Sequence, residues 1–358
     1  MKKFDYIDSI RGIAILGIIC HVNSYGGISL TLPPFFEKVT GFGAKGVQLF
    51  FIASAFTLFL SFRNRVKIER SPIRNFFIRR FLKIAPLFYI SMVYYSIQNG
   101  LNHAYALSGA SFQTGLSVFS HLIFLHGWNP NWIDSIVPGE WSIGVEMSFY
   151  FLLPLLFIKV KNLNNAFDYL ILSLILNIIF QIILKDSSWF VSDKIKDNYL
   201  FFFLPNQLPI FFFGIIMYFI VVEHESVRKI HFTKYLIFFA ILLFQLYTSI
   251  QFFHIFFGII FLVFCVLLSI YRFPIFVNPV LNHIGKISFS FYLCHFAVIF
   301  WFNTLQIPII SSNNLIEFWF KFFIITSVSV LISTIMYNFV EIPFQNLGKY
   351  IINKLEKE

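Results

Sequence analysis

Long apolar runs follow one another along almost the whole chain, and most are close to 20 residues in length. A helix needs about 20 apolar residues to cross a bilayer core of about 30 Å, and it satisfies its own backbone hydrogen bonds there. The pattern therefore predicts an all-α integral membrane protein with about ten transmembrane helices. We place them at residues 9–25, 43–62, 80–98, 141–159, 166–184, 203–222, 235–250, 252–271, 287–304 and 317–338.

Two features lie at the edges of these spans. The apolar stretch 116–126 is too short to cross a bilayer, so we interpret it as a re-entrant or interfacial segment in the loop before the fourth span. Trp141 begins the fourth span, and tryptophan is typical of membrane surfaces. We therefore expect Trp141 to be an interfacial anchor.

Composition excludes an ordinary soluble protein. Hydrophobic side chains make up 58% of the 358 residues and charged ones 12%, against roughly 25% charged in soluble domains. No repeat or long polar stretch divides the chain, so we expect a single membrane domain over residues 1–358 and no separate soluble domain. The three cysteines lie within apolar runs and are not expected to form disulfides.

The basic residues are unevenly divided between the two sides of the predicted helices. With a cytoplasmic N-terminus, only six of the 27 lie outside, namely Lys38, Lys45, Lys185, Lys194, Lys196 and Lys321. The positive-inside rule predicts this asymmetry, so we expect both termini in the cytoplasm. The net charge of +10 fits contact with membrane lipids, and no nucleic-acid partner is expected.

Residues 63–83 are the most basic segment, with eight Lys or Arg residues against one acid, Glu69. One interpretation is a topology anchor that touches anionic lipid. The other is a site for a phosphorylated cytosolic ligand. Arg79, Arg80 and Lys83 favour the second, because they begin a membrane helix, where a guanidinium group can bind phosphate in partly dry surroundings.

Ionisable residues within membrane spans mark functional sites by default. His21, in the first span, is either a buried neutral imidazole bonded to a neighbouring helix or a general base that deprotonates a sugar hydroxyl. Arg11 begins the same span. Glu146, in the fourth, must be protonated, hydrogen-bonded or paired with a cation, and orienting a catalytic histidine would meet that need.

Ser288, Tyr292 and His295 follow i, i+4, i+7 spacing at the start of the ninth span and so share one helix face. They either line a pocket or form hydrogen bonds that hold helices together. Both interpretations stay open.

Histidines and acids also gather in the loop before the fourth span. No spacing among them matches a zinc motif, so no metal site is expected. These residues are His103, His121, His126, Asp134 and Glu140. We interpret the loop instead as a surface rich in Asn, Trp and Tyr that faces an acceptor substrate.

Four segments, in this order, resemble the acyltransferase-3 family of membrane O-acetyltransferases over nearly the whole chain. They are YIDSIRGIAILGIICH (6–21), GVQLFFIASAFTLFLSF with FFIRRFLKIAP (46–86), FLHGWNPNWIDSIVPGEWSIGVEMSFYFLLP (124–154), and IGKISFSFYLCHFAVIF with VEIPF (284–344). Four such segments in order are a specific signal.

The resemblance implies a bacterial inner-membrane enzyme. It would take an acyl group from cytosolic acetyl-CoA, a donor substrate rather than a bound cofactor, and transfer it to a hydroxyl of a carbohydrate or lipid-linked glycan. Family members modify lipopolysaccharide O-antigen, exopolysaccharide, peptidoglycan or lipid-linked sugars. By position, His21 would be the catalytic histidine, Arg11 part of its motif, Arg79 and Arg80 the arginines linked to CoA, and Glu146 the fourth-span acid.

The spacing of Arg11 and His21 departs from the family pattern. Nine residues separate them here, and the family usually has ten. An ideal helix would therefore place the two side chains about 80° apart around its axis.

Two other classes of function stay open. A transporter or flippase for a lipid-linked sugar would use the same charges for coupling, and broken helices in two matching halves would support it. The sequence has no such repeat. A structural or sensory membrane protein would use its buried Arg, His and Glu residues for packing alone. The sequence does not indicate an oligomeric state.

Overall fold

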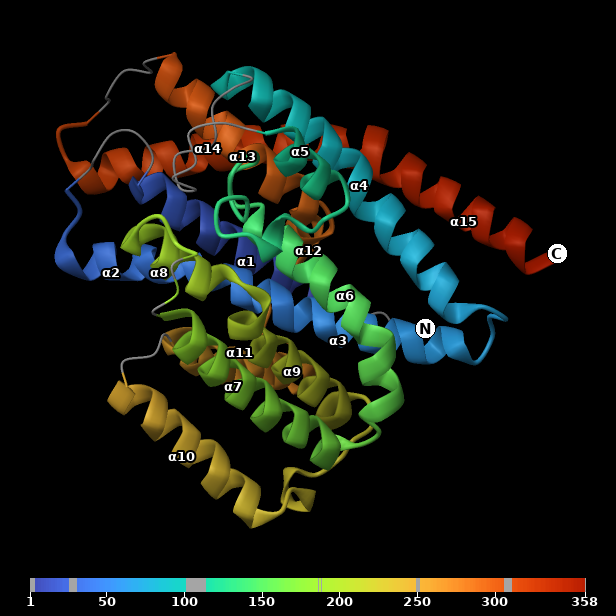
Figure 1. The fold of residues 1–358 in the computed structure, drawn as a ribbon. Coiled ribbons are helices and arrows are strands. Elements are labelled where there is room, and N and C mark those ends of the chain that lie inside the picture. The colour runs from blue at the N-terminus through green and yellow to red at the C-terminus, as the bar shows by residue number, and fades with distance from the viewer. Residues whose placement is uncertain are drawn as a thin grey trace. The chain divides into compact units, whose positions relative to one another are not determined.

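The structure is a computed structural model that describes residues 4–25, 31–100, 114–185, 187, 189–248, 252–305 and 311–357 (Figure 1). Every regular element within these ranges is helical. The long helices are α1 (Asp5–Tyr25), α3 (Gly46–Val66), α4 (Pro72–Asn99), α6 (Trp141–Lys159), α7 (Leu163–Lys185), α9 (Leu204–Val221), α10 (Phe232–Thr248), α11 (Phe253–Ile270), α13 (Ser288–Thr304) and α14 (Asn314–Met336).

Shorter elements connect the long helices. They are α2 (Pro34–Phe42), η1 (Gly43–Lys45), α5 (Gly115–Leu122), η2 (His126–Trp128), α8 (Asp193–Phe202), η3 (Val227–Lys229), α12 (Pro279–Lys286), the π-helix η4 (Tyr337–Glu341) and α15 (Ile342–Lys357). The predicted short segment 116–126 corresponds to α5 and the start of η2.

Each of the ten predicted spans corresponds to one long helix. The largest difference is at α4, which begins at Pro72 rather than at residue 80, since proline is well suited to the first turn of a helix. Among the described residues, six helices are long and apolar enough to cross a membrane: Pro34–Val66, Trp141–Lys159, Leu163–Lys185, Asp193–Val221, Phe253–Ile270 and Asn314–Lys357. A seventh is added if α12 and α13, bent by 80°, form one span. The fold is that of an all-α membrane protein, and the count of ten spans stays a prediction.

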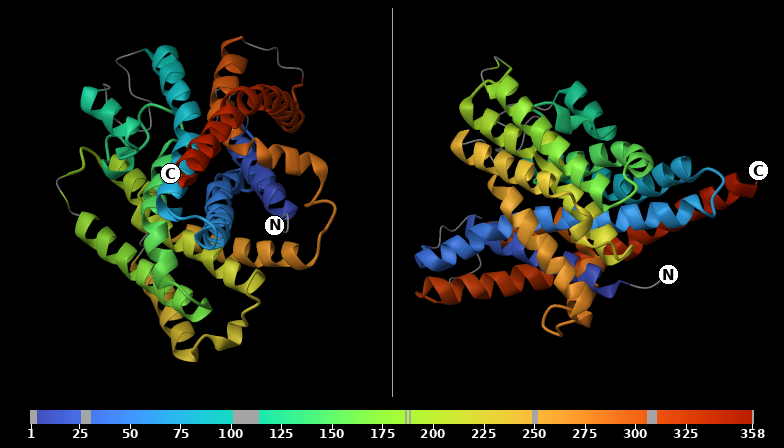
Figure 2. Two further views of the ribbon diagram at one scale, coloured as in Figure 1. Left: turned by 90° about the vertical axis from the view of Figure 1, so that its right-hand side faces the viewer. Right: turned by 90° about the horizontal axis from the view of Figure 1, so that it is seen from below.

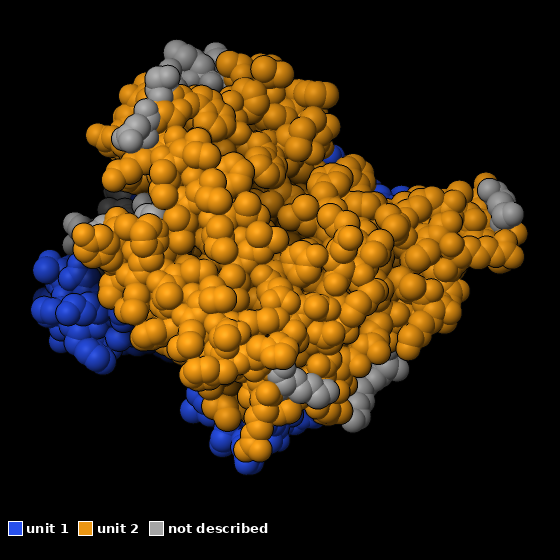
Figure 3. Space-filling model, turned by 60° about the horizontal axis from the view of Figure 1, so that its bottom comes forward, with its two compact units in different colours: residues 1–50, 82–91, 268–350 blue, residues 51–81, 92–267, 351–358 orange. Residues whose placement is uncertain are grey.

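The chain divides into two compact units that interleave along the sequence, shown in two colours in Figure 3. Unit 1 comprises residues 1–50, 82–91 and 268–350, and unit 2 comprises residues 51–81, 92–267 and 351–358. Unit 1 therefore contains α1, α2, α12, α13, α14 and η4. Unit 2 contains α5 to α10, while α3, α4, α11 and α15 contribute to both.

In unit 1, α1 and α12 pack with their backbones in close contact. A Cβ on Gly12 would collide with the carbonyl oxygen of Leu281, and one on Gly285 would collide with that of Asp8. Small residues allow membrane helices to approach in this way. The contact fixes the helix that carries His21.

In unit 2, α7 packs against α9 and α10 (Figures 1 and 2). Phe149 of α6 and Phe51 of α3 both stack on Phe211 of α9, with ring centroids 4.1 and 4.6 Å apart. Trp141 is buried and stacks on Phe202 at 4.4 Å. The prediction of an interfacial anchor is wrong for Trp141, because its ring fills space between helices.

Candidate functional site

Glu146 of α6 accepts two side-chain hydrogen bonds at one carboxylate oxygen, Oε1. The Ser54 hydroxyl of α3 donates at 2.5 Å, and the Tyr150 hydroxyl, one turn along α6, donates at 2.7 Å. A carboxyl group within a membrane span needs such partners. The i+4 spacing of Tyr150 is visible in the sequence. Ser54 lies 92 positions away, and nothing in a single sequence indicates its contact.

Arg80 of α4 stands beside the same group of side chains. Its guanidinium carbon lies 5.9 Å from the ring centre of Tyr150 and 5.8 Å from that of Phe76. A cation over an aromatic face is attracted by the quadrupole of the ring. Tyr150 thus donates a hydrogen bond from its hydroxyl to Glu146, and the face of its ring lies next to Arg80. Unit 2 therefore brings two predicted site residues, Glu146 and Arg80, into one cluster.

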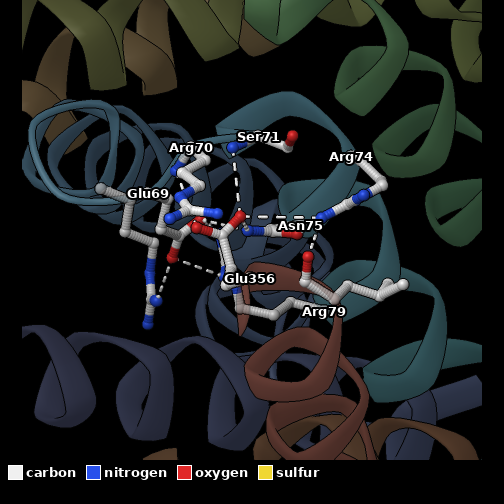
Figure 4. A network of polar contacts seen from close by, with 9 residues as sticks. Glu69, Arg70, Ser71, Arg74, Asn75, Arg79 and Glu356 are labelled. Atoms are coloured by element: carbon white, nitrogen blue, oxygen red, sulfur yellow. Dashed lines mark hydrogen bonds and ion pairs between the residues drawn. The ribbon is translucent and has the colours of Figure 1, made fainter. Parts of the chain in front are cut away.

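Arg79 has a different environment, shown in Figure 4. Its guanidinium donates two hydrogen bonds to the Glu69 carboxylate, at 2.8 and 3.1 Å, and Arg65 donates a third at 2.8 Å. Burial raises the pKa of Glu69, but the hydrogen bonds from Arg79 and Arg65 outweigh burial and hold that pKa below its ordinary value. Arg79 is therefore paired with an acid of its own chain, and its contact with CoA stays a prediction.

Glu356 of α15 completes the network in Figure 4. Its carboxylate accepts the backbone N–H groups of Arg70 and Ser71, at 2.7 and 3.1 Å, and the side-chain amide of Asn75 at 2.8 Å. Asn75 also donates to Glu69 at 3.2 Å. An anion at the start of a helix is favoured by the helix dipole and by N–H groups that lack helical partners. The basic segment is thus organised around two acids.

A second cluster, fully buried, joins α5 to the start of α6. His121 donates from Nε2 to the Glu140 carboxylate at 2.9 Å and from Nδ1 to the Ser117 carbonyl at 2.7 Å. Burial lowers the pKa of His121, but the charge of Glu140, together with hydrogen bonds to Glu140 and to the backbone of Ser117 and Trp132, outweighs burial and raises that pKa. Burial raises the pKa of Glu140, but His121, the charge of His126 and a backbone hydrogen bond from Ile136 together outweigh burial and lower that pKa. Neither His121 nor Glu140 is exposed, so neither side chain can face a substrate.

His126 and Asp134 belong to the same buried cluster. The His126 ring stacks on that of His121 at 4.4 Å, and burial lowers the pKa of His126 to about 3. Burial and the charge of Glu140 raise the pKa of Asp134 well above its ordinary value. Within the described part of the chain, no three His, Cys, Asp or Glu residues are arranged to hold a metal ion. His103 lies outside the described residues.

His21 lies near the end of α1 in unit 1. It forms a hydrogen bond with the backbone of Thr40 in α2 and interacts electrostatically with Lys45. Its side chain is partly exposed, as a proton acceptor for a substrate would need to be. Glu146 belongs to unit 2, so the pairing of His21 with Glu146 stays a prediction.

Glu341 is a buried acid that the sequence analysis did not single out. It lies in the π-helix η4 and accepts hydrogen bonds from the backbone N–H of Ser290, at 3.1 Å, and from the Ser290 hydroxyl. Lys83 of α4 interacts favourably with its charge. π-Turns within helices are frequent at functional sites. In the sequence, the only indication of Glu341 is the acid within the segment VEIPF.

The remaining predicted residues lie in unit 1. Arg11 pairs with Asp8 at 3.8 Å on α1. Ser288, Tyr292 and His295 are buried on α13, and His295 donates from Nδ1 to the Tyr292 carbonyl at 2.7 Å. Their burial favours the packing role over the pocket.

Comparisons with known proteins point to one family. The family model described as "Acyltransferase domain" matches residues 4–338. A protein of Staphylococcus aureus strain COL, named as a putative O-acetyltransferase, is 25% identical over 98% of this chain and 59% of its own length. Its counterpart in strain MSSA476 has the same identity and coverage. A Caenorhabditis elegans protein named regulator of hypoxia-inducible factor 1 is 27% identical over 43% of this chain and 34% of its own.

The chain thus spans 59% of the length of the Staphylococcus relatives that it matches. No solved structure matches it.

Proposed function

This chain belongs to the acyltransferase-3 family, and from that premise we propose that it is a membrane O-acetyltransferase. Its donor is acetyl-CoA from the cytoplasm, and its acceptor is a hydroxyl of a cell-surface or lipid-linked carbohydrate. It acts as a multi-pass protein of a bacterial inner membrane, without a permanently bound cofactor. The names of the Staphylococcus relatives support O-acetyl transfer.

The observation that carries the proposal is the cluster of Ser54, Glu146, Tyr150 and Arg80 in unit 2. Acyl transfer from a thioester needs a group that accepts a proton. It also needs a positive charge that stabilises the anionic donor. Glu146 is held as an acceptor by two hydroxyls, and Arg80 supplies the charge beside it.

The other predicted residues have separate roles in the proposed reaction. His21 is the general base that removes the proton from the acceptor hydroxyl, since imidazole titrates near neutral pH. Arg79, Arg80 and Lys83 bind the phosphates of CoA, and Arg11 is a further residue that binds acyl-CoA. Glu146 assists proton transfer.

The proposal is tested with purified protein in nanodiscs, acetyl-CoA and lipid-linked glycan. Release of free CoA and the mass of the glycan are measured together. The wild-type protein should release CoA and add one acetyl mass to the glycan. His21→Ala should lower the rate by about 10²–10⁴-fold, the usual contribution of a general base.

Three results would contradict parts of this proposal. A His21→Ala protein that acetylates at the wild-type rate removes His21 from the role of base. Wild-type protein that neither binds acetyl-CoA nor releases CoA contradicts the enzyme assignment. In a deletion strain, loss of glycan amount or length, rather than loss of an acetyl mass, would favour a transporter.

A further inference from the structure

Ser54 differs from Thr57 and Ser173, two other aliphatic hydroxyl side chains in the helices of unit 2. A hydroxyl within a helix commonly donates to a carbonyl one turn back. Thr57 donates to the Ala53 carbonyl on α3, and Ser173 donates to the Leu170 carbonyl on α7. Ser54 instead donates to a carboxylate of another helix.

The contact has the geometry of an activated nucleophile. Such a site needs a hydroxyl within hydrogen-bond reach of a base, and a third group that orients the base. Ser54 is the hydroxyl, Glu146 is the base at 2.5 Å, and Tyr150 orients the carboxylate at 2.7 Å. Arg80 lies next to this group, over the ring of Tyr150.

A second serine–glutamate pair, Ser290 with Glu341, provides a comparison within unit 1. Ser290 has an exposed fraction of 0% and Glu341 of 2%, so this pair is closed to any substrate. Glu146 is partly exposed and Ser54 has an exposed fraction of 9%. A reacting thioester needs access, and of the two pairs Ser54 with Glu146 is the less buried.

We propose that Ser54 is a catalytic nucleophile that carries the acetyl group between donor and acceptor as an ester on its hydroxyl. This inference rests on the proposed function, and it adds a covalent intermediate to it. The ligand that acylates Ser54 is a short-chain acyl thioester.

The two half-reactions balance. In the first, the Ser54 oxygen attacks the thioester carbonyl, a C–O bond forms, and the C–S bond breaks. The Ser54 proton passes to Glu146 and then to the leaving thiolate, so that CoA departs as a thiol. In the second, the acceptor hydroxyl attacks the acetyl-serine carbonyl and gives its proton to the general base of the proposed function. The C–O bond to Ser54 breaks and the acetylated acceptor is released. The Ser54 oxygen takes up a proton from solvent as the base releases one to solvent, so the enzyme returns to its starting state.

A covalent relay suits a site within a membrane helix. Ser54 lies nine residues before Arg63 on α3, about 14 Å along the helix axis at 1.5 Å per residue. By the predicted topology, Arg63 is at the cytoplasmic end. An acetyl group held at Ser54 allows CoA to return to the cytoplasm before the acceptor binds.

The test is isotope exchange in the absence of any acceptor. Wild-type protein in nanodiscs is incubated with acetyl-CoA and radiolabelled CoA, and label in acetyl-CoA is measured. A covalent intermediate predicts exchange without acceptor, and the peptide that contains Ser54 should gain the mass of one acetyl group after acid quenching. Ser54→Ala should reduce both to background.

Further variants separate chemistry from folding. Glu146→Gln should slow exchange by about 10²–10⁴-fold, as expected for loss of a general base. Ser54→Cys keeps a nucleophile and should form an acyl-enzyme that neutral hydroxylamine cleaves, unlike the serine ester. Ser173→Ala, the matched control, should exchange at the wild-type rate. His21→Ala should keep exchange and lose transfer to the acceptor.

The outcomes distinguish this proposal from the proposed function. Wild-type protein that acetylates the acceptor without any exchange overturns the role of Ser54 and leaves the enzyme assignment intact. A Ser54→Ala protein that still exchanges at the wild-type rate overturns it equally. Wild-type protein that shows neither transfer nor CoA release overturns both.

Discussion

Two neighbouring arginines of α4 have different partners. Arg79 donates two hydrogen bonds to Glu69, whereas Arg80 lies over the rings of Phe76 and Tyr150. Successive residues of a helix point about 100° apart, so adjacent side chains meet different neighbours. The pair that looks uniform in the sequence therefore divides into a cation held by its own chain and a cation beside the candidate site.

The Glu69 network predicts a stabilising role for this acid. Glu69→Gln removes a carboxylate that accepts charged hydrogen bonds from Arg65 and Arg79. Charged hydrogen bonds contribute about 1.5–3 kcal/mol, so the free energy of unfolding should fall by about that amount. The measurement is thermal unfolding of the detergent-purified variant. Asp193→Asn, the control, breaks an exposed surface pair with Lys196 and should leave the melting temperature unchanged. An equal decrease of the melting temperature in both variants would contradict the prediction.

The buried His121–Glu140 pair predicts a pH dependence. The folded-state pKa of His121 is raised, so its contribution is fully present below the unfolded value of about 6.5 and is lost as pH rises through the folded value. The pKa of Glu140 is lowered, so its contribution persists throughout that alkaline range. The wild-type melting temperature should therefore fall above about pH 6.5.

The variant His121→Gln tests whether the melting temperature falls with rising pH because of His121. Leaving Glu140 without its charged partner should cost about 3–5 kcal/mol at pH 6, and the alkaline decrease should disappear. Thermal unfolding from pH 6 to pH 9 measures both. Parallel curves for the variant and the wild-type protein would exclude His121 as the titrating group.

Single residues were predictable only where their partners are close in sequence. Tyr150 is four residues from Glu146, which makes the contact visible as a helix neighbour. Ser54 and Glu341 meet partners on distant helices, and periodicity does not show which helices pack together. The prediction for Trp141 is wrong for the same reason, because its sequence position at a helix start does not reveal that its ring stacks on Phe202.

At the scale of elements, apolar length predicted ten helices because a membrane helix satisfies its backbone alone. It did not predict α2, α8, α12 or α15, which are short or amphipathic and have no 20-residue apolar run. Nor did it predict the π-turn η4, because one extra residue per turn leaves hydrophobic composition unchanged.

The close contact between α1 and α12 predicts that one added methyl group at the contact lowers the free energy of unfolding. A Cβ at Gly285 would collide with the Asp8 carbonyl, so Gly285→Ala must separate the two helices. Overpacking of this kind costs about 1–3 kcal/mol, and more where the clash is with backbone. Thermal unfolding should show the loss.

Gly41→Ala is the matched control on α2. A Cβ there meets nothing within 4 Å, so the substitution should be neutral or stabilising by up to about 1 kcal/mol, since alanine is the better helix former. If Gly285→Ala unfolds at the same temperature as Gly41→Ala, the close contact of α1 with α12 is wrong.

At the scale of the whole molecule, contacts between helix ends agree with the predicted topology. Within unit 1, Arg272 pairs with Asp5 at 3.3 Å. Within unit 2, Glu356 accepts the backbone N–H of Ser71 at 3.1 Å. Polar groups that meet at helix ends must lie on the same side of the membrane. An even number of membrane crossings must therefore separate the two members of each pair. The predicted topology places eight spans between Asp5 and Arg272, and eight between Ser71 and Glu356.

Cysteine labelling tests this topology directly. In a protein whose native cysteines are replaced, Lys67→Cys and Lys354→Cys should react with a membrane-impermeant maleimide only after cells are opened, because both lie at predicted cytoplasmic ends. Lys194→Cys, in α8, should react in intact cells or spheroplasts. Labelling of Lys354→Cys but not Lys67→Cys in intact cells would require an odd number of crossings between them. That result would contradict both the span count and the contact of Glu356 with the start of α4.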